Sequence, residues 1–497
     1  MKLKVKDIDI ATGWPLVAVM NEIDALKLDL HHGDRVKIKK GKKNVIAIID
    51  ISESKKTVPS GQIGLYEEVL IKLNARSGNL VDISLVEKPA SIQYIKKKLK
   101  GKKLSYGEFY QIIDDIIKNK LSEIEITYFV SACYTKGLDL DETVSLTKAM
   151  VNTGEILKLN KYPVMDKHCI GGVAGNRTTM VVVPIIAAAG LTIPKTSSRS
   201  ITSPAGTADT MEVLCNVCFS IKEIKNIVRK TNACLVWGGS VNLAPADDKI
   251  IRIEHPVSLD PEGQLLASIL AKKKSVSATH LLVDIPIGKG TKIESRIKAL
   301  HLKRLFESIS KKLGIKIMVV ITDGSQPIGN GIGPALEARD VMWVLENDLR
   351  QPFDLREKSI KMAGLLLEIG DKAKKGAGAK KALEILKSGA AYKKMIEIIK
   401  AQGGKKIKAE DIKIGKFAYN FKANKSGLII HIDNESISKI AKAAGAPLDN
   451  GAGIYFHKHV KNFVKKGDKI FTIYAENKQK LKYSINLLKK TDGVVVK

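Results

Sequence analysis

The sequence predicts a multidomain α/β protein with four parts: a small N-terminal β-rich module, a helical domain, a large α/β domain with a mixed, mostly parallel sheet, and a C-terminal α+β module. Three observations support this prediction. The length of 497 residues is enough for two to four domains. Hydrophobic residues make up 44% of the chain and aromatic residues only 5%, so aliphatic side chains would build the core. The spacing of the apolar residues also changes from strand-like to helix-like and back.

The N-terminal module covers residues 1–88. Segments such as HHGDRVKIKKGKKNVIAIIDIS and SGNLVDISLVEK alternate apolar and charged residues, with Gly at the turns. This alternation is typical of strands that place one face in a core. No cluster in the module has a catalytic pattern, and Pro89 closes it.

The helical domain follows over residues 91–160. Its apolar residues recur at i, i+3, i+4 and i+7, which is the spacing of amphipathic helices. Ser105 with Glu108, and Ser122 with Glu125, have the spacing of capping boxes. Two helices are therefore expected to begin at these serines.

The α/β domain is predicted for residues 161–345, because short apolar runs alternate there with segments of helical pattern. The runs TTMVVVPIIAAAG, LTIPKTSS, THLLVDIPIG and KIMVVITDG are apolar enough for core strands or buried helices, and their spacing leaves both alternatives open. In mostly parallel sheets, ligands bind at loops beyond the carboxyl ends of the strands. Residues 346–415 are expected to be mainly helical, and residues 416–497 return to strand signals in a compact α+β module.

The formal net charge of +31 raises the question of a polyanionic partner. Lys residues are spread along the whole chain, however, and few aromatic residues lie between them to stack on bases. We therefore expect an attraction for small anionic substrates and no nucleic-acid partner. The alternative, a polyanion-binding protein, would bind DNA or RNA tightly and with a steep salt dependence.

Cysteine usage and hydropathy point to a cytoplasmic protein without a membrane partner. Five Cys in a chain of this length indicate a reducing compartment, and no apolar run has the length of a membrane span or a signal-peptide core. The CNVC stretch, Cys215–Cys218, has metal or redox spacing, but no second pair follows, which favours core cysteines. No His, Cys or Asp cluster has convincing ligand spacing, so we predict no metal and no cofactor.

Two stretches of the predicted α/β domain have the composition of oxyanion sites. In DKHCIGGVAGNRTT, Asp166–Thr179, Lys167 supplies a charge and the glycines let backbone N–H groups approach a ligand. In TSSRSITSPAGTAD, Thr196–Asp209, seven hydroxyls accompany Arg199, whose planar guanidinium suits a bidentate phosphate contact. Each stretch, taken alone, also fits an ordinary turn before a helix.

Two further stretches add a carboxylate and a second basic loop. In EHPVSLDPEGQLLASILAKKK, Asp260 is a loop carboxylate, and Ser268 and Lys272 lie four apart on one helix face. In LLVDIPIGKGTKI, a strand leads into a glycine loop with Lys289 and Lys292. The four stretches together describe one or two bound oxyanions and a carboxylate, without a covalent nucleophile.

The stretches DKHCIGGVAGN, SSRSITSPAGTAD, LDPEGQLLASILAKK and LSEIEITYFVSACYTKGLDLDETVSLTKAM resemble the nucleoside phosphorylase-II family. This family includes thymidine and pyrimidine-nucleoside phosphorylases and, more distantly, anthranilate phosphoribosyltransferase. The resemblance runs from about Ser91 to the C-terminus. The N-terminal β module and the SSR, ITS and AGTAD segments resemble the archaeal branch of the family, the AMP phosphorylases.

The resemblance implies a reaction in which orthophosphate attacks the anomeric carbon of a nucleoside 5′-monophosphate, most of all AMP, and gives the free base and ribose 1,5-bisphosphate. No metal or organic cofactor is implied. Asp260 would give a proton to the leaving base, for which burial should raise its pKa. The family also implies that residues of about 245–275 join the helical domain, and that the chain forms a homodimer or a larger homo-oligomer.

Individual positions follow from the family's motifs. The nucleotide-binding positions would be Gly172, Ser198, Arg199, Ser200, Ile201, Thr202, Ser203, Thr207, Ser268 and Lys292. The positions for the attacking phosphate would be Lys167, Thr178, Ser197 and Thr207. Thr207 belongs to both sets and could contact either phosphate.

Two positions depart from the family pattern. Cys169 stands where the family usually has Ser, and a thiol is a weaker hydrogen-bond donor than a hydroxyl. Ile253 stands where the thymidine branch has an Arg that reads the pyrimidine, with Arg252 one residue away. This second departure weakens the alternative of a thymidine or pyrimidine-nucleoside phosphorylase. A magnesium-dependent phosphoribosyltransferase is a third possibility.

Overall fold

The computed structural model describes residues 1–13, 16–54, 56–86, 89–200, 203–241, 243–254, 256, 259–491 and 493–497. Contacts group the chain into two compact units. Unit 1 comprises Met1–Leu138 and Ala246–Glu262, and unit 2 comprises Asp139–Pro245 and Gly263–Lys497.

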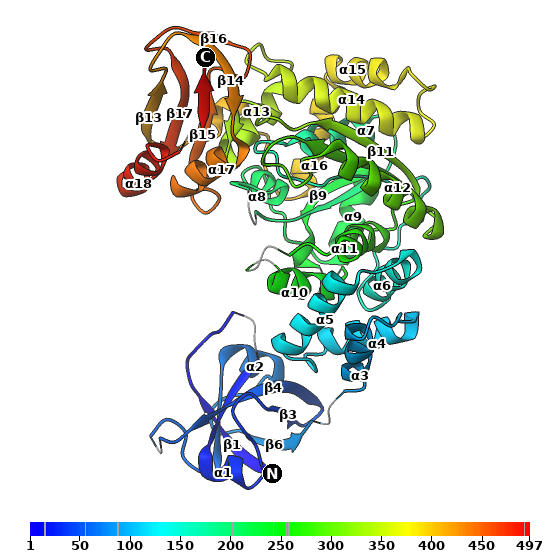
Figure 1. The fold of residues 1–497 in the computed structure, drawn as a ribbon, viewed down its shortest axis with the longest axis vertical. Helices are drawn as coiled ribbons and strands as arrows, with labels where there is room; N and C mark the ends of the chain where they lie inside the picture. The colour runs from blue at the N-terminus through cyan, green and yellow to red at the C-terminus, as the bar shows by residue number, and fades with distance from the viewer. Residues whose placement is uncertain are drawn as a thin grey trace. The chain divides into compact units, whose positions relative to one another are not determined.

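Unit 1 begins with a closed β-barrel, whose strands are blue in Figure 1 and follow the order β1-β5-β2-β4-β3-β6. The strands are β1 (Lys2–Asp7), β2 (Val17–Asn21), β3 (Arg35–Lys40), β4 (Lys43–Ser52), β5 (Gln62–Leu65) and β6 (Leu80–Leu85). Two short helices, α1 (Glu22–Leu26) and α2 (Glu67–Leu73), connect barrel strands. In β3, Val36 and Ile38 are buried while Lys37 and Lys39 are exposed. The alternation of apolar and charged residues that the sequence shows thus places the apolar side chains inside the barrel and the charged ones outside.

Helices make up the rest of unit 1. They are α3 (Ser91–Leu99), α4 (Tyr106–Ile117), α5 (Glu123–Lys136) and nearly all of α10 (Pro245–Glu254). Both predicted capping boxes are confirmed, at the start of α4 and of α5. Lys249 of α10 donates to the backbone oxygens of Ile116 (2.7 Å) and Ile117 (3.0 Å) at the end of α4, which joins the distant segment to the bundle.

Two further helices, each of which follows a segment of unit 1 directly in the sequence, are grouped with unit 2 by their contacts. These are α6 (Leu140–Asn152) and α11 (Glu262–Ser275, from Gly263 on). Their Val144, Leu266 and Leu270 are buried in the same cluster as Leu281 and Val283 of the central strand of unit 2.

The core of unit 2 is parallel. One sheet has the order β11-β10-β7, with β7 (Met165–Cys169), β10 (His280–Ile287) and β11 (Lys316–Asp323), and a second pairs β8 (Ile193–Ser197) with β9 (Ala233–Trp237). All these pairings are parallel, and a parallel bridge between Val164 and Thr192 connects the two sheets. The carboxyl ends of the five strands therefore point the same way, as the sequence predicted for an α/β domain.

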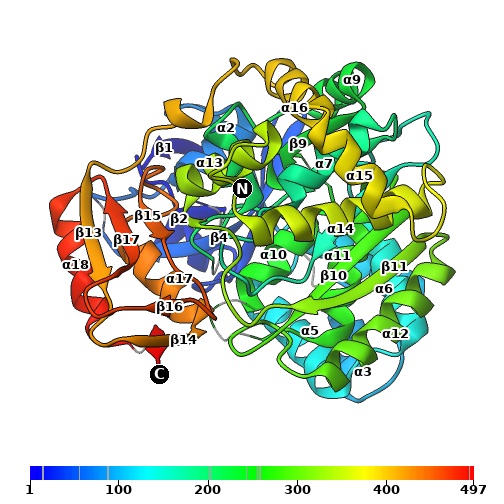
Figure 2. The same cartoon turned by 90° about the horizontal axis from the view of Figure 1, so that it is seen from above.

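Helices cover both faces of this sheet. They are α7 (Thr178–Ala188), α8 (Thr207–Glu212), α9 (Ile221–Thr231), α12 (Arg296–Lys312), α13 (Pro334–Glu346), α14 (Phe353–Ile369), α15 (Gly378–Lys387) and α16 (Ala390–Ala401). Figure 2 shows β10 and β11 between α14 and α12. Of the four apolar runs, three form strands β8, β10 and β11, and TTMVVVPIIAAAG forms α7. Because α7 packs against α14 and α16, every residue of Thr178–Ala187 is buried.

The C-terminal part of unit 2 is an antiparallel α+β module, as predicted. One sheet has the order β12-β15-β17-β13, with β12 (Gly331–Ile332), β13 (Phe417–Lys422), β15 (Gly453–Phe456) and β17 (Lys469–Ala475). A second has the order β16-β14-β18, with β14 (Gly427–Ile432), β16 (Phe463–Val464) and β18 (Val494–Val496). Helices α17 (Asn434–Ala443) and α18 (Lys478–Leu488) complete the module. Pairing of Ile332 with Ile454 connects the module to a loop of the parallel domain.

Three properties of the described residues bear on function. No helix within the described ranges has the length and apolar character needed to cross a bilayer. Among those same residues, no group of three or more His, Cys, Asp or Glu side chains is placed to hold a metal ion. All five Cys are free thiols.

Candidate active site

Glycine-rich loops meet at the carboxyl ends of β7, β10 and β11. A Cβ atom on Gly172, whose φ is +90°, would lie 2.5 Å from the backbone N of Lys292 and 2.7 Å from the Cα of Thr291. A Cβ on Gly288 would lie 2.7 Å from the backbone C of Gly324. Only glycine permits these approaches. Gly172 and Lys292, two predicted nucleotide-binding residues, are therefore side by side.

Lys167 and Thr178, two predicted phosphate-binding residues, are also together. Lys167 lies on β7 with 1% of its surface exposed, and its Nζ donates to Thr178 Oγ1 at 2.8 Å. Thr178, the first residue of α7, donates in turn to Asn176 Oδ1 at 2.9 Å. Burial lowers the pKa of Lys167, and the carboxylate of Asp284 acts against this shift. The pair places a cation and a hydroxyl at the start of a buried helix.

Cys169 ends β7 beside this pair. Asn176 Nδ2 donates to Cys169 Sγ at 3.3 Å. Loss of hydration raises the pKa of the thiol, and the negative charge of Asp284 raises it further. The thiol is therefore protonated at neutral pH and is no nucleophile in this environment.

Asp284 is a buried carboxylate on β10 that the sequence motifs did not reveal. It accepts from Thr322 Oγ1 at 2.6 Å, and Lys358 Nζ lies 3.1 Å from its other oxygen. Although burial alone would raise the pKa of Asp284, the charges of Lys167 and Lys358 hold it below its ordinary value. The only sequence signal was an acidic residue inside the apolar run LLVDIPIG.

The hydroxyl-rich stretch forms the loop between β8 and α8, and its side chains fold back on it. Ser203 Oγ donates to the backbone oxygen of Ala205 at 2.8 Å, and Ser200 Oγ donates to that of Ser203. Asp209 accepts from the backbone N–H groups of Ser200 (2.6 Å) and Gly206 (2.7 Å). Ser197 Oγ donates to the oxygen of Val236 at 3.2 Å, and Ser198 is exposed. The predicted residues Ile201 and Thr202 lie outside the described residues.

Arg199 is held by carboxylates. Its Nη2 donates to Glu212 Oε1 at 2.7 Å, and its Nη1 lies 3.2 Å from Asp209 Oδ1. The guanidinium also stands over the ring of Trp237, 4.9 Å from the centroid. Glu212 raises the pKa of Arg199 further, so the group is a permanent cation. A phosphate would have to replace one of these carboxylates to bind both terminal nitrogens.

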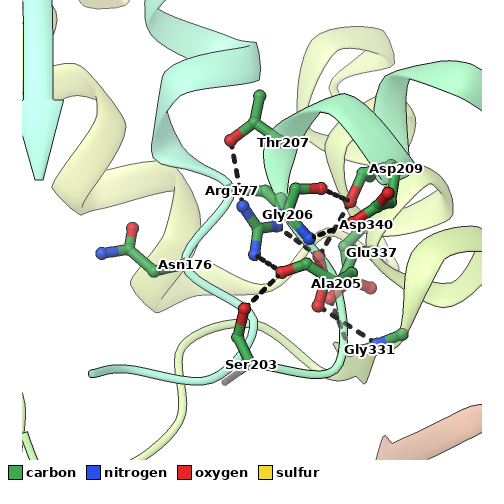
Figure 3. Close-up of polar contacts among 12 residues, drawn as sticks. Asn176, Arg177, Ser203, Ala205, Gly206, Thr207, Asp209, Gly331, Glu337 and Asp340 are labelled. Carbon is green, nitrogen blue, oxygen red and sulfur yellow. Dashed lines mark hydrogen bonds and ion pairs between the residues drawn. The ribbon is translucent and has the colours of Figure 1, made fainter. Parts of the chain in front are cut away.

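Arg177, which sequence reasoning missed, links the β7 loop to the β8 loop (Figure 3). Its Nη2 donates to the oxygen of Ala205 at 2.6 Å, its Nη1 to Thr207 Oγ1 at 3.0 Å, and its Nε to Glu337. Glu337, on α13, also accepts from Thr210 Oγ1 at 3.0 Å. No local spacing could have revealed the pair, because 160 residues separate Arg177 from Glu337.

The loop before β12 is anchored by the same helix (Figure 3). Asp340 of α13 accepts from the backbone N–H groups of Asn330 (2.6 Å) and Gly331 (2.7 Å). Burial raises the pKa of Asp340 to about 7, against the effect of these two hydrogen bonds.

A second buried cluster of charged side chains surrounds Asp166 of β7. Lys273 Nζ of α11 is 2.9 Å from Asp166 Oδ2, and Lys195 Nζ of β8 is 3.5 Å from Asp166 Oδ1. Burial lowers the pKa of Lys195 to about 7, and the charge of Lys273 acts in the same direction against the attraction of Asp166. Ser268 is partly exposed on α11, the helix that carries Lys273.

Asp260, the predicted proton donor, lies just before α11 and is exposed, so the burial that was expected for it from the sequence is not found in this structure. Asp260 belongs to unit 1. The described residues among the predicted nucleotide-binding and phosphate-binding positions all belong to unit 2.

Comparison with known proteins shows which class of enzyme has this parallel sheet with glycine loops at its carboxyl edge. Family models match residues 92–154 (glycosyl transferase family, helical bundle domain), 161–392 (glycosyl transferase family, a/b domain) and 428–493 (pyrimidine nucleoside phosphorylase C-terminal domain). Anthranilate phosphoribosyltransferase from Thermus thermophilus has a similar fold, with a TM-score of 0.54 at 16% identity, over 62% of this chain and 99% of that one. The chain is thus a glycosyltransferase of this fold.

Similarity over the full length then gives the family. The AMP phosphorylase of Thermococcus kodakarensis is 48% identical over 99% of this chain and 97% of its own. That of Pyrococcus furiosus is 48% identical over 100% of this chain and 98% of its own. The chain belongs to the AMP phosphorylase family, as its motifs predicted. These alignments include the N-terminal barrel, which the three family models leave out.

Proposed function

We propose that this protein catalyses the phosphorolysis of nucleoside 5′-monophosphates, with AMP and orthophosphate as substrates and adenine and ribose 1,5-bisphosphate as products. The observation that carries the proposal is the junction of two oxyanion-type loops, after β7 and after β8, through Arg177 and Thr207. A substrate that brings its own phosphate needs two such loops, one for each phosphate. The full-length relatives named AMP phosphorylase support the same conclusion.

In the proposed reaction an oxygen of orthophosphate forms a bond to the anomeric carbon while the bond from that carbon to the base breaks. The electron pair of the broken bond stays with the base, which takes a proton from Asp260. Nothing in this balance calls for an organic cofactor or a metal. The remaining residues would bind the two anions and hold them in line for displacement.

The assignment of residues is part of the proposal. Orthophosphate would be bound by Lys167, Thr178, Ser197 and Thr207. The nucleotide would be bound by Gly172, Ser198, Arg199, Ser200, Ile201, Thr202, Ser203, Thr207, Ser268 and Lys292. Lys167 with Thr178 has the strongest support, because a buried ammonium beside a hydroxyl and a helix start is suited to a phosphate oxygen. We also propose a cytoplasmic homodimer or larger homo-oligomer.

A substrate panel tests the reaction. AMP, CMP, UMP, adenosine and thymidine are each incubated with phosphate, and the sugar product is identified by mass spectrometry. We expect release of adenine from AMP together with ribose 1,5-bisphosphate. Cleavage of the unphosphorylated nucleosides alone would overturn the proposal and favour a pyrimidine-nucleoside phosphorylase. Turnover that needs pyrophosphate and Mg²⁺ in place of orthophosphate would favour a phosphoribosyltransferase.

The role of the β8 loop has its own test. Ser203→Ala removes a hydroxyl from this loop, and Arg199→Lys removes the planar fork. If the loop holds the 5′-phosphate, both variants lose far more activity with AMP than with adenosine. Equal losses on the two substrates would show that the loop contributes structure only.

A further inference from the structure

The hydroxyl of Thr207 has a constrained direction. A threonine hydroxyl has one hydrogen to donate and two lone pairs that accept. Arg177 Nη1 donates to Thr207 Oγ1 at 3.0 Å, and a guanidinium has no acceptor atom. The hydrogen of the hydroxyl must therefore point away from Arg177. Within the described ranges it meets no other partner, and Thr207 is partly exposed.

Arg177 itself is fixed on three sides. It is 7% exposed and donates at once to Ala205, Thr207 and Glu337 (Figure 3). Its backbone precedes α7, next to Asn176, whose side chain contacts Cys169 and Thr178. Each of the three guanidinium nitrogens thus already donates to a protein group, which fixes the direction of the fork.

Glu337 keeps this arrangement in place. Its side chain is buried, on α13, and it accepts from Arg177 Nε, from Thr210 Oγ1 at 3.0 Å and from the backbone N–H of Gly333 at 3.1 Å. The carboxylate thus balances the charge of Arg177 and fixes the plane of its fork. Removal of either partner would leave the other charge buried and uncompensated.

We propose that Arg177 is a positioning residue, which makes the hydroxyl of Thr207 a polarised donor toward a phosphate oxygen of the substrates. The inference rests on the proposed function. Arg177 does not touch the substrate; it occupies a lone pair of the hydroxyl and leaves the O–H group free to donate. Because a charged donor stands behind the hydroxyl, the O–H group becomes a stronger donor to an anion. The phosphate oxygen belongs either to orthophosphate or to the 5′-phosphate of the nucleotide.

A double-mutant cycle on the full-length enzyme tests the coupling. Its members are the wild type, Thr207→Val, Arg177→Lys and the double variant, each assayed for kcat and for the KM of AMP and of orthophosphate. We expect each single variant to raise one of these KM values by about tenfold, the loss of a hydrogen bond to a charged group. We expect the double variant to show about the same tenfold rise, because Arg177 acts only through Thr207. The KM that changes identifies which phosphate Thr207 contacts.

A control separates this role from damage to the fold. Thr231→Val removes a buried hydroxyl on α9 whose partners among the described residues are local backbone groups: the oxygens of Ile227 (2.9 Å) and Ala233 (2.6 Å), and the N–H of Ala233, which donates to it at 3.3 Å. It should leave both KM values unchanged, whatever it does to the melting temperature. Three results would overturn the inference: multiplicative effects in the double variant, a Thr207→Val variant with unchanged KM values, or an Arg177→Lys variant that changes only the melting temperature.

The cycle can also be read without turnover, which separates this inference from the proposed reaction. Inorganic phosphate should raise the melting temperature of the wild type more than that of the variants, with the same non-additivity. If the wild type fails to cleave AMP but shows this pattern, the reaction is wrong and the coupling holds. If the wild type cleaves AMP and both cycles are additive, the coupling is wrong and the reaction holds.

Discussion

At the scale of single residues, Cys169 is the clearest departure from the family pattern. Its thiol accepts a hydrogen bond from Asn176 Nδ2, and Asn176 Oδ1 accepts a hydrogen bond from the hydroxyl of Thr178. Sulfur is a weak acceptor and the thiol a weak donor. Cys169 thus fills the space beside Asn176, but its hydrogen bond with Asn176 is weaker than the one that a serine hydroxyl would make.

Cys169→Ser should therefore preserve activity and leave the KM for phosphate unchanged or lower. A serine hydroxyl fits the same place and makes stronger hydrogen bonds with Asn176. The measurement is the KM for orthophosphate at saturating AMP, with Cys218→Ser, an exposed cysteine, as the matched control. A large loss of activity would show that the thiol has a chemical part of its own.

Asp260→Asn should lose most of its turnover while nucleotide binding is kept. The amide keeps the size and shape of the side chain but has no acidic proton to give, and proton transfer is worth roughly 10²- to 10⁴-fold in rate. The measurements are kcat and the affinity for AMP by calorimetry. Asp141→Asn, which changes an exposed carboxylate paired with Lys312, serves as the control. Near-normal turnover of Asp260→Asn would contradict the assigned role.

Local pattern was enough to predict some of these residues and not others. Lys167 and Thr178 stand in one motif, eleven positions apart, where a strand leads through glycines into a helix. Arg177 stands in the same motif, but its meaning depends on Glu337 and on a loop from another strand. Asp284 depends in the same way on Lys358. Such pairs form only when distant elements pack, so no spacing in the sequence records them.

At the scale of elements, the start of α17 contributes to the candidate site from the C-terminal module. Asn434 is 1% exposed and bridges two glycine loops. Its Oδ1 accepts from the backbone N–H of Ala174 at 3.1 Å, and its Nδ2 donates to the oxygen of Gly324 at 3.0 Å. The module thus fixes the loops that follow β7 and β11, although its residues lie far away in sequence.

Asn434→Ala should weaken substrate binding through these loops. It leaves two buried backbone groups without partners, at a cost in stability of about 1–3 kcal/mol for each group, and it frees the loops to move. We expect higher KM values for AMP and for phosphate together with a lower melting temperature. The control is Asn477→Ala, which removes the N-cap of α18 in the same module, where Asn477 accepts from Gln479 N–H at 2.7 Å. If both variants change KM alike, Asn434 acts through the stability of the module and not through the loops.

The elements themselves were largely predictable, with one instructive exception. Strands β8 and β10 and the capping boxes of α4 and α5 follow from local patterns. The run that became α7 carries three consecutive Val residues and an internal Pro184, which favour a strand or a break. It is a helix because α14 and α16 enclose it on the outside of the sheet. Tertiary burial decided a case in which local preference could not.

At the scale of the whole molecule, the net charge is +31, and nearly all of the Lys and Arg side chains that the structure describes are at least partly exposed to solvent. The barrel strand β3 is typical, since its lysines alternate with buried Val36 and Ile38. A spread positive field of this kind attracts anionic substrates and raises their local concentration. The buried lysines are different, because they must be balanced within the fold. Lys167 has Asp284 nearby, while Lys195 and Lys273 share the single carboxylate of Asp166.

The burial of Lys195 beside this shared carboxylate makes the stability of the fold depend on pH. Burial lowers the pKa of Lys195 from its ordinary 10.5 to about 7, and Lys273 contributes in the same direction. Below pH 7 the lysine is protonated in both the folded and the unfolded chain, so the cost of burying its charge is fully present. Between pH 7 and about 10.5 only the unfolded chain holds the proton, so the stability of the wild type rises with pH, by at most about 1.4 kcal/mol per pH unit. Above that range both states are neutral and the contribution is constant.

Lys195→Met removes the titrating group and should remove this dependence. We expect the wild type to gain stability relative to the variant as the pH rises from 7 toward 10, because the wild type sheds a buried charge that the variant never carries. The measurement is the midpoint of thermal unfolding for both proteins at pH 6, 7, 8, 9 and 10. Lys303→Met, a substitution of a surface lysine on α12, should show a nearly constant difference over the same range. A wild-type advantage that stays flat or falls above pH 7 would show that Lys195 keeps its proton in the fold, and that Asp166 balances both ammonium groups at once.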